Sequence, residues 1–336
     1  MKKINILLVG FGPRGKIWSK VIKKNTSVNL VGICDINKNT KNKNYKKIPF
    51  FLSLNNALFT LKPDAVILST PPFKRMKDLK VCAQYKLPVL VEKPLAVNFK
   101  DAEKLVNFMN SQKLLLMVGL NFRYLPSTIE KIKLINSNKV GRPNFSKFIY
   151  ERWRDGKLKR LNKYPLIMKQ PMLWEQSIHH FDLIRFIYKS NVKNVFAITS
   201  NPPWSMYADD ANVSAFLELK NGMTVNYIGN WQSNCKSLNF EWRTDCTKGV
   251  IIQKKQFSDL NYRKTNSLKF KKINLKNFKM WSDDADLLLM DFIRILNKDN
   301  QQNFIKINRD HLNSLSVVDA CIESSKTGKK INLDFY

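Results

Sequence analysis

Three titratable residues stand close together in a largely apolar stretch of the chain. Glu175, His179 and Asp182 are spaced i, i+4 and i+7, which places them on one face of a predicted α-helix. An imidazole titrates near neutral pH, so His179 can act as a general acid or base, and Glu175 can orient it or balance its charge. Glu175 and His179 would offer a metal only two ligands, so we expect no metal site. Asp182 is expected either to contact a substrate or to form structural hydrogen bonds.

A second candidate for chemistry follows a short apolar run. Glu92, Lys93 and Pro94 come directly after residues 88–91, which have the pattern of a buried strand. Pro94 restricts the backbone at this point. A lysine held in a partly desolvated cleft can donate a proton or polarise a carbonyl oxygen. We therefore predict that Lys93 takes part in the chemistry, either by proton transfer or by polarising the substrate oxygen; the alternative is an ordinary exposed turn.

A glycine-rich turn near the N-terminus predicts where a nucleotide would bind. The apolar residues 6–9 lead into Gly10, Gly12 and Gly15 of a Gly-x-Gly-x-x-Gly motif, and a helix-compatible segment follows. Backbone N–H groups at the start of such a helix can hold a diphosphate. Asp35 ends the next strand candidate about 20 residues later, where a carboxylate binds an adenosine ribose. The pattern predicts a dinucleotide site, with a glycine-rich turn that holds no ligand as the alternative.

The elements that must position these residues alternate between strand and helix over the first 120 residues. Such alternation is typical of a parallel sheet covered on both faces, whose ligand lies at the carboxyl ends of the strands. The glycine turn, Asp35, Thr70 and Glu92 all fall at predicted strand ends. The expected strands are 4–9, 28–34, 49–51, 64–69, 88–91 and 114–118, and the expected helices are 16–24, 53–59, 74–85 and 98–111.

The pattern changes after about residue 140, where strands follow one another without helices between them. A run of this kind predicts an antiparallel or mixed sheet, and Asn221-Gly222 is a strong hairpin signal. We predict an α/β domain with a doubly wound parallel sheet over residues 1–122, and an α+β domain with a large open mixed or antiparallel sheet over residues 123–336. The expected elements are helices 171–188, 283–296 and 309–326, and strands 144–150, 195–200, 213–219, 223–231, 238–243, 250–253 and 331–335.

Composition narrows the class of protein. The chain has 336 residues and a formal net charge of +32, which could indicate nucleic acid or an anionic membrane surface as a partner. The charge is mostly lysine spread over the whole length, so we interpret it as compositional bias and expect neither partner; residues 38–47, the densest patch, are expected to form a solvated loop or short helix. No apolar run is long enough to span a bilayer. The five cysteines are scattered and odd in number, which favours a reducing cytoplasm.

Taken together, these motifs resemble those of the glucose–fructose oxidoreductase / inositol dehydrogenase (Gfo/Idh/MocA) family. The resemblance covers essentially the whole chain. It rests on the glycine motif 10–15, Asp35, Ser69-Thr-Pro-Pro72, Glu92-Lys-Pro94 and residues 175–182. It implies a Rossmann domain followed by a domain whose open sheet often mediates homodimers or homotetramers. It also implies NAD(P)-dependent oxidation or reduction of sugars, inositols or related polyols.

The resemblance also implies a set of site residues. The expected catalytic residues are Lys93, His179 and Glu175. The expected cofactor-binding residues are Gly10, Phe11, Gly12, Arg14, Gly15, Asp35, Thr70, Pro71, Glu92, Lys93 and Asn121. The expected substrate contacts are Tyr124, Trp153, Trp174 and Asp182, with Arg154 as a further candidate. NAD is expected in preference to NADP, because Asp35 can accept two ribose hydroxyls but repels a 2′-phosphate; Lys38 nearby keeps NADP possible.

Three positions depart from the family pattern. Glu175 stands where Asp is commoner, Ser177 where Gly is usual, and Arg75 where many members have His. Glu175 keeps the charge, so we expect the chemistry to survive. Arg75 is expected either to favour an anionic substrate or to be exposed.

The leading interpretation is a cytoplasmic oxidoreductase that transfers hydride between a nicotinamide and a secondary alcohol. Three alternatives stay open. One is a non-redox enzyme of the same family that hydrolyses glycosides through transient oxidation by a tightly held NAD. Another is an inactive dinucleotide-binding protein, and the last is a nucleic-acid binder, whose affinity would depend steeply on salt.

Overall fold

A computed structural model describes residues 3–40, 45, 47–73, 75–159, 161–236, 238–297 and 301–333, the side chains of residues 301 and 302 excepted. It divides into two compact units. Unit 1 comprises Met1–Asn121 and Lys279–Leu312, and unit 2 comprises Phe122–Phe278 and Asn313–Tyr336. The division differs from the single boundary predicted after residue 122, since a late segment returns to unit 1.

The segment Lys279–Leu312 belongs to unit 1 because its apolar side chains pack there. The helix α7 (Asp283–Leu296) buries an apolar stripe that includes Leu288, Leu289 and Phe292. It packs against α1 (Pro13–Lys24), and Asn25 at the end of α1 donates a hydrogen bond to Asp286. Sequence patterns within α7 predict the buried stripe but not the partner that covers it.

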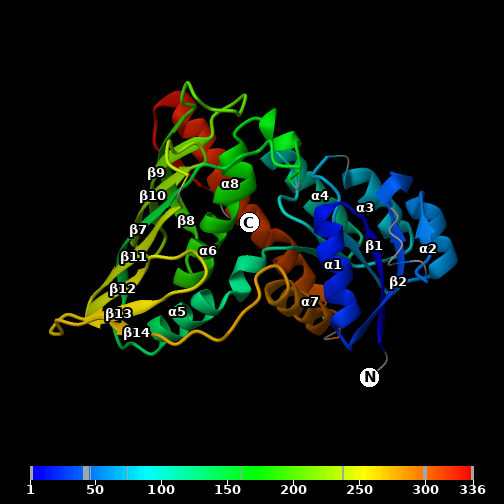
Figure 1. The fold of residues 1–336 in the computed structure, drawn as a ribbon, viewed down its shortest axis with the longest axis horizontal. Coiled ribbons are helices and arrows are strands. Elements are labelled where there is room, and N and C mark those ends of the chain that lie inside the picture. The colour runs from blue at the N-terminus through cyan, green and yellow to red at the C-terminus, as the bar shows by residue number, and fades with distance from the viewer. Residues whose placement is uncertain are drawn as a thin grey trace. The chain divides into compact units, whose positions relative to one another are not determined.

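Unit 1 is a six-stranded parallel sheet with helices; its N-terminal segment is blue to cyan in Figure 1, and its later helix α7 is orange. The strand order is β3-β2-β1-β4-β5-β6, in which the chain reverses direction across the sheet between β1 and β4. The predicted Rossmann fold is therefore confirmed. Its strands are β1 (Ile4–Val9), β2 (Val28–Cys34), β3 (Phe50–Phe51), β4 (Ala65–Leu68), β5 (Val89–Val91) and β6 (Leu116–Val118). The remaining helices of this part of the chain are α2 (Leu54–Leu61), α3 (Arg75–Gln84) and α4 (Phe99–Ser111), and α8 (Gln301–Thr327) begins here.

Local sequence explains where several of these elements begin. The side chain of Asn98 accepts a hydrogen bond from the backbone of Asp101 at 2.8 Å and so caps α4. Ser53 caps α2 in the same way, and Pro13 stands in the first turn of α1, where its missing N–H has no helical partner to lose. β1 and β4 are buried on both faces, as expected for the centre of a parallel sheet.

Unit 2 is built on a nine-stranded mixed sheet of order β14-β13-β12-β11-β7-β10-β9-β8-β15. β7 and β10 pair in parallel, and the other neighbours are antiparallel. The predicted hairpin joins β9 to β10, with Gly222 at φ 82°. The strands are β7 (Pro143–Glu151), β8 (Val192–Ser200), β9 (Asn212–Leu219), β10 (Thr224–Asn230), β11 (Asn239–Cys246), β12 (Gly249–Gln253), β13 (Asn261–Lys264), β14 (Lys271–Lys272) and β15 (Ile331–Asn332). Figure 1 shows α5 (Pro126–Asn136) and α6 (Ile178–Tyr188) along one face of this sheet.

The helix predicted over residues 171–188 contains an interruption. Its second turn, Leu173–Ser177, is a π-helix, and α6 follows from Ile178. A π turn is wider than an α turn and is frequent at functional sites. Glu175 lies inside the π turn, whereas His179 and Asp182 lie in α6. The prediction of one regular α-helix through all three residues is therefore wrong.

Three predictions fall partly outside the described residues. The helix predicted over 74–85 is observed as α3, and residue 74 is not described. In the segment 38–47, Lys38–Thr40 form one 3₁₀ turn, and residues 41–44 and 46 are not described. The predicted last strand is observed at Ile331–Asn332, and residues 334–336 are not described. Within the described ranges, every helix is too short or too polar to cross a membrane.

Candidate active site

Five strands of unit 1 end in a single row. The parallel register aligns their last residues, from Cys34 through Val9, Leu68 and Val91 to Val118. The residues that follow therefore lie along one edge of the sheet. They are Gly10, Asp35, Ser69, Glu92 and Gly119. Three of the predicted motifs are thus brought to one edge, on both sides of the point where the strand order reverses.

The three glycines of the turn have different structural roles. Gly10 has φ 88°, and a Cβ there would come within 2.9 Å of the Ser69 backbone. A Cβ on Gly15 would lie 2.0 Å from the Gly10 carbonyl oxygen, so only glycine allows helix and strand to approach. A Cβ on Gly12 would meet no atom within 4 Å. The protein itself therefore requires Gly10 and Gly15, whereas Gly12 leaves open space above the turn.

Asp35 is fixed beside this turn. Its carboxylate accepts hydrogen bonds from the backbone N–H of Phe11 at 2.5 Å and of Asn37 at 2.8 Å. Each carboxylate oxygen has a second lone pair with which to accept a ribose hydroxyl. The next residue, Ile36, is an almost fully exposed apolar side chain. Such a pair suits an adenosine, with hydroxyls for Asp35 and a flat apolar ring for Ile36.

Arg14 and Glu92, both predicted cofactor residues, bind each other. Glu92 Oε1 accepts a hydrogen bond from Arg14 Nε at 2.5 Å and another from Trp18 Nε1 at 2.6 Å. The guanidinium of Arg14 lies 5.7 Å from the ring centroid of Trp18 and 5.4 Å from that of Trp281. Trp18 and Trp281 were not predicted, because their types and spacing carry no motif.

Asn121, also predicted, is held by the return segment. It donates a hydrogen bond to the carboxylate of Asp284, which is fully buried. Burial raises the pKa of Asp284, and the Asn121 hydrogen bond and the charge of Arg14 act in the opposite direction. Asp284 therefore joins this side of the site, although no sequence motif marked it.

Arg75 corrects both expectations made for it. Only 2% of its surface is exposed, so it is neither a surface residue nor placed to meet an anionic substrate. Its guanidinium donates hydrogen bonds to the carbonyl oxygens of Thr70 at 2.8 Å, Leu95 at 3.0 Å and Pro94. It thus links the turn after β4 to the turn that carries Lys93.

Lys93 follows β5 and is half-buried, and the Lys93–Pro94 peptide bond is cis. Thr70 and Pro71 follow β4. The hydroxyl oxygen of Thr70 is buried and has no hydrogen-bond partner among the described residues, and Pro71 is exposed. A buried hydroxyl without a partner at this edge can bind a ligand group.

In unit 2, His179 is 4% exposed and its ring stacks on Phe122, with centroids 4.1 Å apart and planes at 16°. Glu175, in the π turn, accepts a hydrogen bond from the Tyr164 hydroxyl at 2.7 Å. Tyr164 lies in a short 3₁₀ turn, Tyr164–Leu166, and was not predicted. The stacking fixes the plane of the imidazole, and the tyrosine hydrogen bond orients the carboxylate.

Asp182 takes the structural alternative. It is 1% exposed and accepts two hydrogen bonds from Arg123, from Nε at 2.8 Å and Nη2 at 2.5 Å. The Ser314 hydroxyl donates a third at 3.1 Å. These donors occupy the carboxylate, so the predicted substrate contact at Asp182 is not supported by its geometry.

The other predicted substrate residues differ in burial. Trp174 is buried in the core, whereas Trp153 is half-buried and forms an isolated β-bridge with Gln232. Tyr124 is half-buried in the turn after Asn121. Arg154 lies over the Trp231 ring at 4.0 Å and donates a hydrogen bond to Tyr207. Of this group, Trp174 is a core residue, and the other three retain accessible surface.

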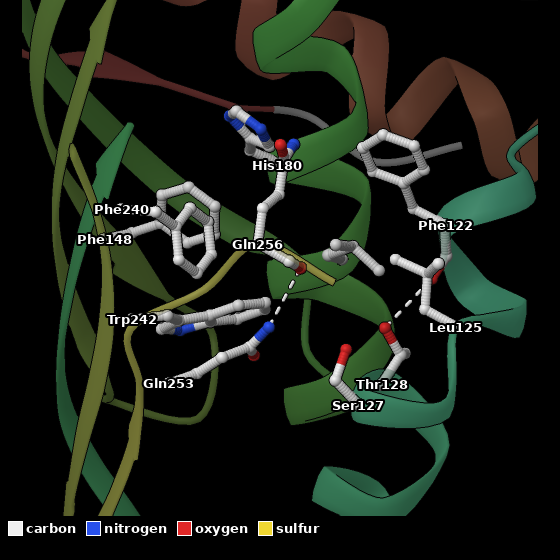
Figure 2. A pocket seen from close by; sticks show the side chains of 11 residues that line it. Phe122, Leu125, Ser127, Thr128, Phe148, His180, Phe240, Trp242, Gln253 and Gln256 are labelled. Carbon is white, nitrogen blue, oxygen red and sulfur yellow. Dashed lines mark hydrogen bonds between the residues drawn. The ribbon is translucent and has the colours of Figure 1, made fainter. Parts of the chain in front are cut away.

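His180 belongs to the interior of unit 2. Its Nδ1 hydrogen-bonds the Tyr227 hydroxyl at 2.8 Å, and burial lowers its pKa to about 3. Tyr227 in turn donates to Ser177, which gives the unusual serine a structural role. Figure 2 shows His180 beside a largely apolar cavity between α5, α6 and the sheet. None of the predicted catalytic residues lines this cavity, so we assign it to the core.

Within the described residues, no cluster of three or more His, Cys, Asp or Glu side chains is arranged to hold a metal ion.

Comparison with known proteins defines the family. A family model described as "Oxidoreductase family, NAD-binding Rossmann fold" matches residues 4–120, and one described as "GFO/IDH/MocA C-terminal domain" matches residues 131–252. The chain belongs to the GFO/IDH/MocA family. The predicted resemblance and the NAD cofactor are therefore confirmed.

Individual members of the GFO/IDH/MocA family match at low identity. A myo-inositol 2-dehydrogenase of Thermotoga maritima is 22% identical over 198 residues, 58% of each chain. An oxidoreductase from Agrobacterium radiobacter, solved with NAD+, L-tartaric acid and magnesium, superposes with a TM-score of 0.86 at 17% identity over 98% of each chain. The WlbA dehydrogenase from Bordetella pertussis, solved with NADH and UDP-GlcNAcA, has a TM-score of 0.81 at 20% identity over the full length of both chains.

The residues of unit 1 fit the dinucleotide of this family. The first turn of α1 has neither a capping side chain nor an acidic residue, so its N–H groups suit an anion. Gly12 leaves open space above them, and the Nη1 atom of Arg14 is buried without a hydrogen-bond partner among the described residues. Arg14 and the helix start would hold the diphosphate, and Asp35 the adenosine ribose.

Proposed function

We propose that this protein is an NAD-dependent dehydrogenase that moves a hydride between the nicotinamide and a secondary alcohol or ketone of a sugar, an inositol or a nucleotide sugar. The observation that carries the proposal is the single row of strand ends that bears the glycine turn, Asp35 and the Glu92-Lys93 pair. The inositol dehydrogenase relative and the solved neighbour with UDP-GlcNAcA support the substrate class.

The reaction divides between cofactor and protein. NAD, when bound, supplies the acceptor or donor of the hydride. In the direction of oxidation, the ammonium of Lys93 stabilises negative charge on the substrate oxygen, and the imidazole of His179 takes the hydroxyl proton. Glu175, oriented by Tyr164, balances the charge that the imidazole acquires. The stacking on Phe122 keeps the imidazole in one plane while the proton moves.

The test combines binding with turnover. Purified protein with NAD or NADP is screened against inositols, sugars, sugar acids and nucleotide sugars by the appearance of reduced cofactor. With a confirmed substrate, Lys93→Ala and His179→Ala should each lower the rate of hydride transfer by about 10²–10⁴-fold and leave NADH affinity close to that of the wild type. The double variant should lose less than the product of the single losses, because both groups act on one oxygen and one proton. A wild-type rate in Lys93→Ala would overturn the assignment.

The same experiment separates the remaining interpretations. Turnover of a glycoside without net release of NADH would identify the non-redox glycosidase. NADH binding without turnover of any compound would identify the inactive protein. Absence of NADH binding, together with salt-dependent binding to DNA or RNA, would contradict the dehydrogenase altogether.

We also propose that the protein forms homodimers or homotetramers through the nine-stranded sheet. Along β8 and β9 the outward face carries the exposed side chains of Phe196, Ile198 and Phe216, and Phe196 pairs directly with Phe216 across the strands. Adjacent exposed aromatic and aliphatic residues on a sheet are typical of an interface. Light scattering at physiological salt should give a molecular mass that is a multiple of 39.2 kDa, and Phe216→Lys should lower this mass by weakening the interface. A wild-type monomer would refute the proposal.

We propose a cytoplasmic location on the chemistry of the cysteines. Cys34, Cys82 and Cys321 are buried thiols rather than disulfides.

A further inference from the structure

Trp281 is the one bulky residue among the described non-glycine residues with positive φ, at φ 68°. The others are Lys, Asn and Gln, and most of them stand at helix C-termini, where such a conformation is common. A tryptophan in the left-handed region is strained and persists only when its surroundings hold it.

A closed turn holds Trp281 in this conformation. The Lys279 carbonyl oxygen accepts hydrogen bonds from the backbone N–H of Ser282 at 3.1 Å and of Asp283 at 3.0 Å. The carboxylate of Asp283 accepts from the Lys279 N–H at 2.9 Å. These bonds close the chain around Trp281 immediately before α7 begins. The indole is 46% exposed, so burial in a core does not explain its position.

Trp281 contacts Arg14. Its ring centroid lies 5.4 Å from the guanidinium carbon, within the range of a cation–π interaction. Glu92 holds Nε of the same guanidinium, and Nη1 is buried with no hydrogen-bond partner in the described structure. The side chain is therefore ordered on one edge and unsatisfied at another, beside the open space over Gly12.

We propose that Trp281 is a positioning residue for the dinucleotide. With Glu92 it fixes the guanidinium of Arg14 so that the remaining N–H groups bind the diphosphate of NAD. Ordering the arginine before the cofactor arrives reduces the conformational entropy lost on binding. This inference rests on the proposed role of Arg14 as a diphosphate ligand, and it extends the site to a segment 267 positions away along the chain.

The experiment is a double-mutant cycle on binding. The dissociation constants of NADH and of ADP-ribose are measured for wild type, Arg14→Ala, Trp281→Ala and the double variant. Arg14→Ala should weaken both ligands by about 10–100-fold, because a charge-assisted contact is lost. Trp281→Ala should weaken both by about fivefold, and it should have no further effect when Arg14 is already absent.

Two controls keep the result interpretable. Trp281→Phe retains an aromatic face and should bind NADH within about twofold of wild type. Phe59→Ala removes another exposed aromatic side chain of unit 1, on α2, and should leave affinity unchanged. Thermal unfolding of each variant excludes general loss of the fold. The emission of Trp281 is obtained, in protein without cofactor, as the difference between the spectrum of a protein and that of the same protein with Trp281→Phe. This difference should change when Arg14→Ala is introduced into both proteins.

The outcomes separate the two proposals. If Arg14→Ala leaves both affinities unchanged, the role of Arg14 in the proposed function is wrong. If Arg14→Ala weakens binding but Trp281→Ala does not, or if the two effects multiply, the positioning role of Trp281 is wrong. Weaker NADH binding with unchanged ADP-ribose binding in Trp281→Ala would also overturn it, because the indole would then act on the nicotinamide rather than through Arg14.

Discussion

Replacing Asp182 by asparagine tests whether this residue supports the fold or contacts the substrate. The change keeps the shape of the side chain and removes its charge, which leaves Arg123 without its carboxylate partner. The existing pair is bidentate and Asp182 is 1% exposed. Removing one charge from a buried pair costs about 3–5 kcal/mol. Because 20% of the Arg123 side chain remains in contact with solvent, we expect about 3 kcal/mol.

The assay is thermal and denaturant unfolding of the full chain. A loss of about 3 kcal/mol corresponds to a fall of about 6–12 °C in the melting temperature of a domain of this size. The matched control is Asp245→Asn, which breaks an equally bidentate pair with Arg243 at 2.7 and 2.8 Å. The side chains of Arg243 and Asp245 are 43% and 40% exposed, so we expect the control to lose less than about 1 kcal/mol of stability. Since both ion pairs are bidentate, the difference between the two stability losses measures the effect of burial.

Unfolding of Asp182→Asn at the wild-type midpoint would contradict the structural role of Asp182. A variant of normal stability with a raised KM for a confirmed sugar substrate would instead make Asp182 a substrate ligand. The double variant Asp182→Asn/Arg123→Met adds a second check, because it removes both charges of the bidentate pair. Arg185, whose Nη1 lies 3.8 Å from Asp182 Oδ1, keeps its charge, so only part of the lost stability should return.

Three further predictions follow from the site. Gly12→Val should abolish NADH binding, because the new side chain occupies the space that the diphosphate needs, and it should leave stability nearly unchanged, because its Cβ meets no protein atom. Gly15→Ala should instead destabilise unit 1, because its Cβ collides with the Gly10 carbonyl oxygen. Normal NADH affinity in Gly12→Val would show that the glycine turn has only a structural role. Wild-type protein should prefer NADH to NADPH, and Asp35→Ser should narrow the difference, whereas tenfold tighter NADPH binding by the wild type would contradict the role of Asp35. The free energy of unfolding should fall as pH decreases from about 6.5 toward about 3. His180 in the unfolded chain gains a proton in this range, whereas the buried ring, with its pKa lowered to about 3, does not. If denaturant melts give His180→Gln the same slope of unfolding free energy against pH as the wild type, the prediction is wrong.

The amino-acid sequence by itself determined the elements whose signals are local. β1 and β2 begin and end at the predicted residues 4–9 and 28–34, because each is a short apolar run followed at once by a glycine turn or Asp35. The glycine motif, the hairpin at Asn221-Gly222 and the alternation of strand and helix likewise depend on neighbours within a few positions. The family resemblance rests on these same short motifs, so it too could be found without coordinates.

Only the tertiary structure decided which side chains those motifs meet. Arg75 was expected to be exposed or to bind an anion, and it is buried because three backbone carbonyls from two turns converge on it. Asp182 meets Arg123 and Ser314 because segments remote in the chain pack together. Trp281 meets Arg14 and Asp284 meets Asn121 because α7 packs its apolar stripe against α1. Each partner is more than 50 residues away or in another turn, and no local pattern specifies a contact that depends on how buried surfaces match.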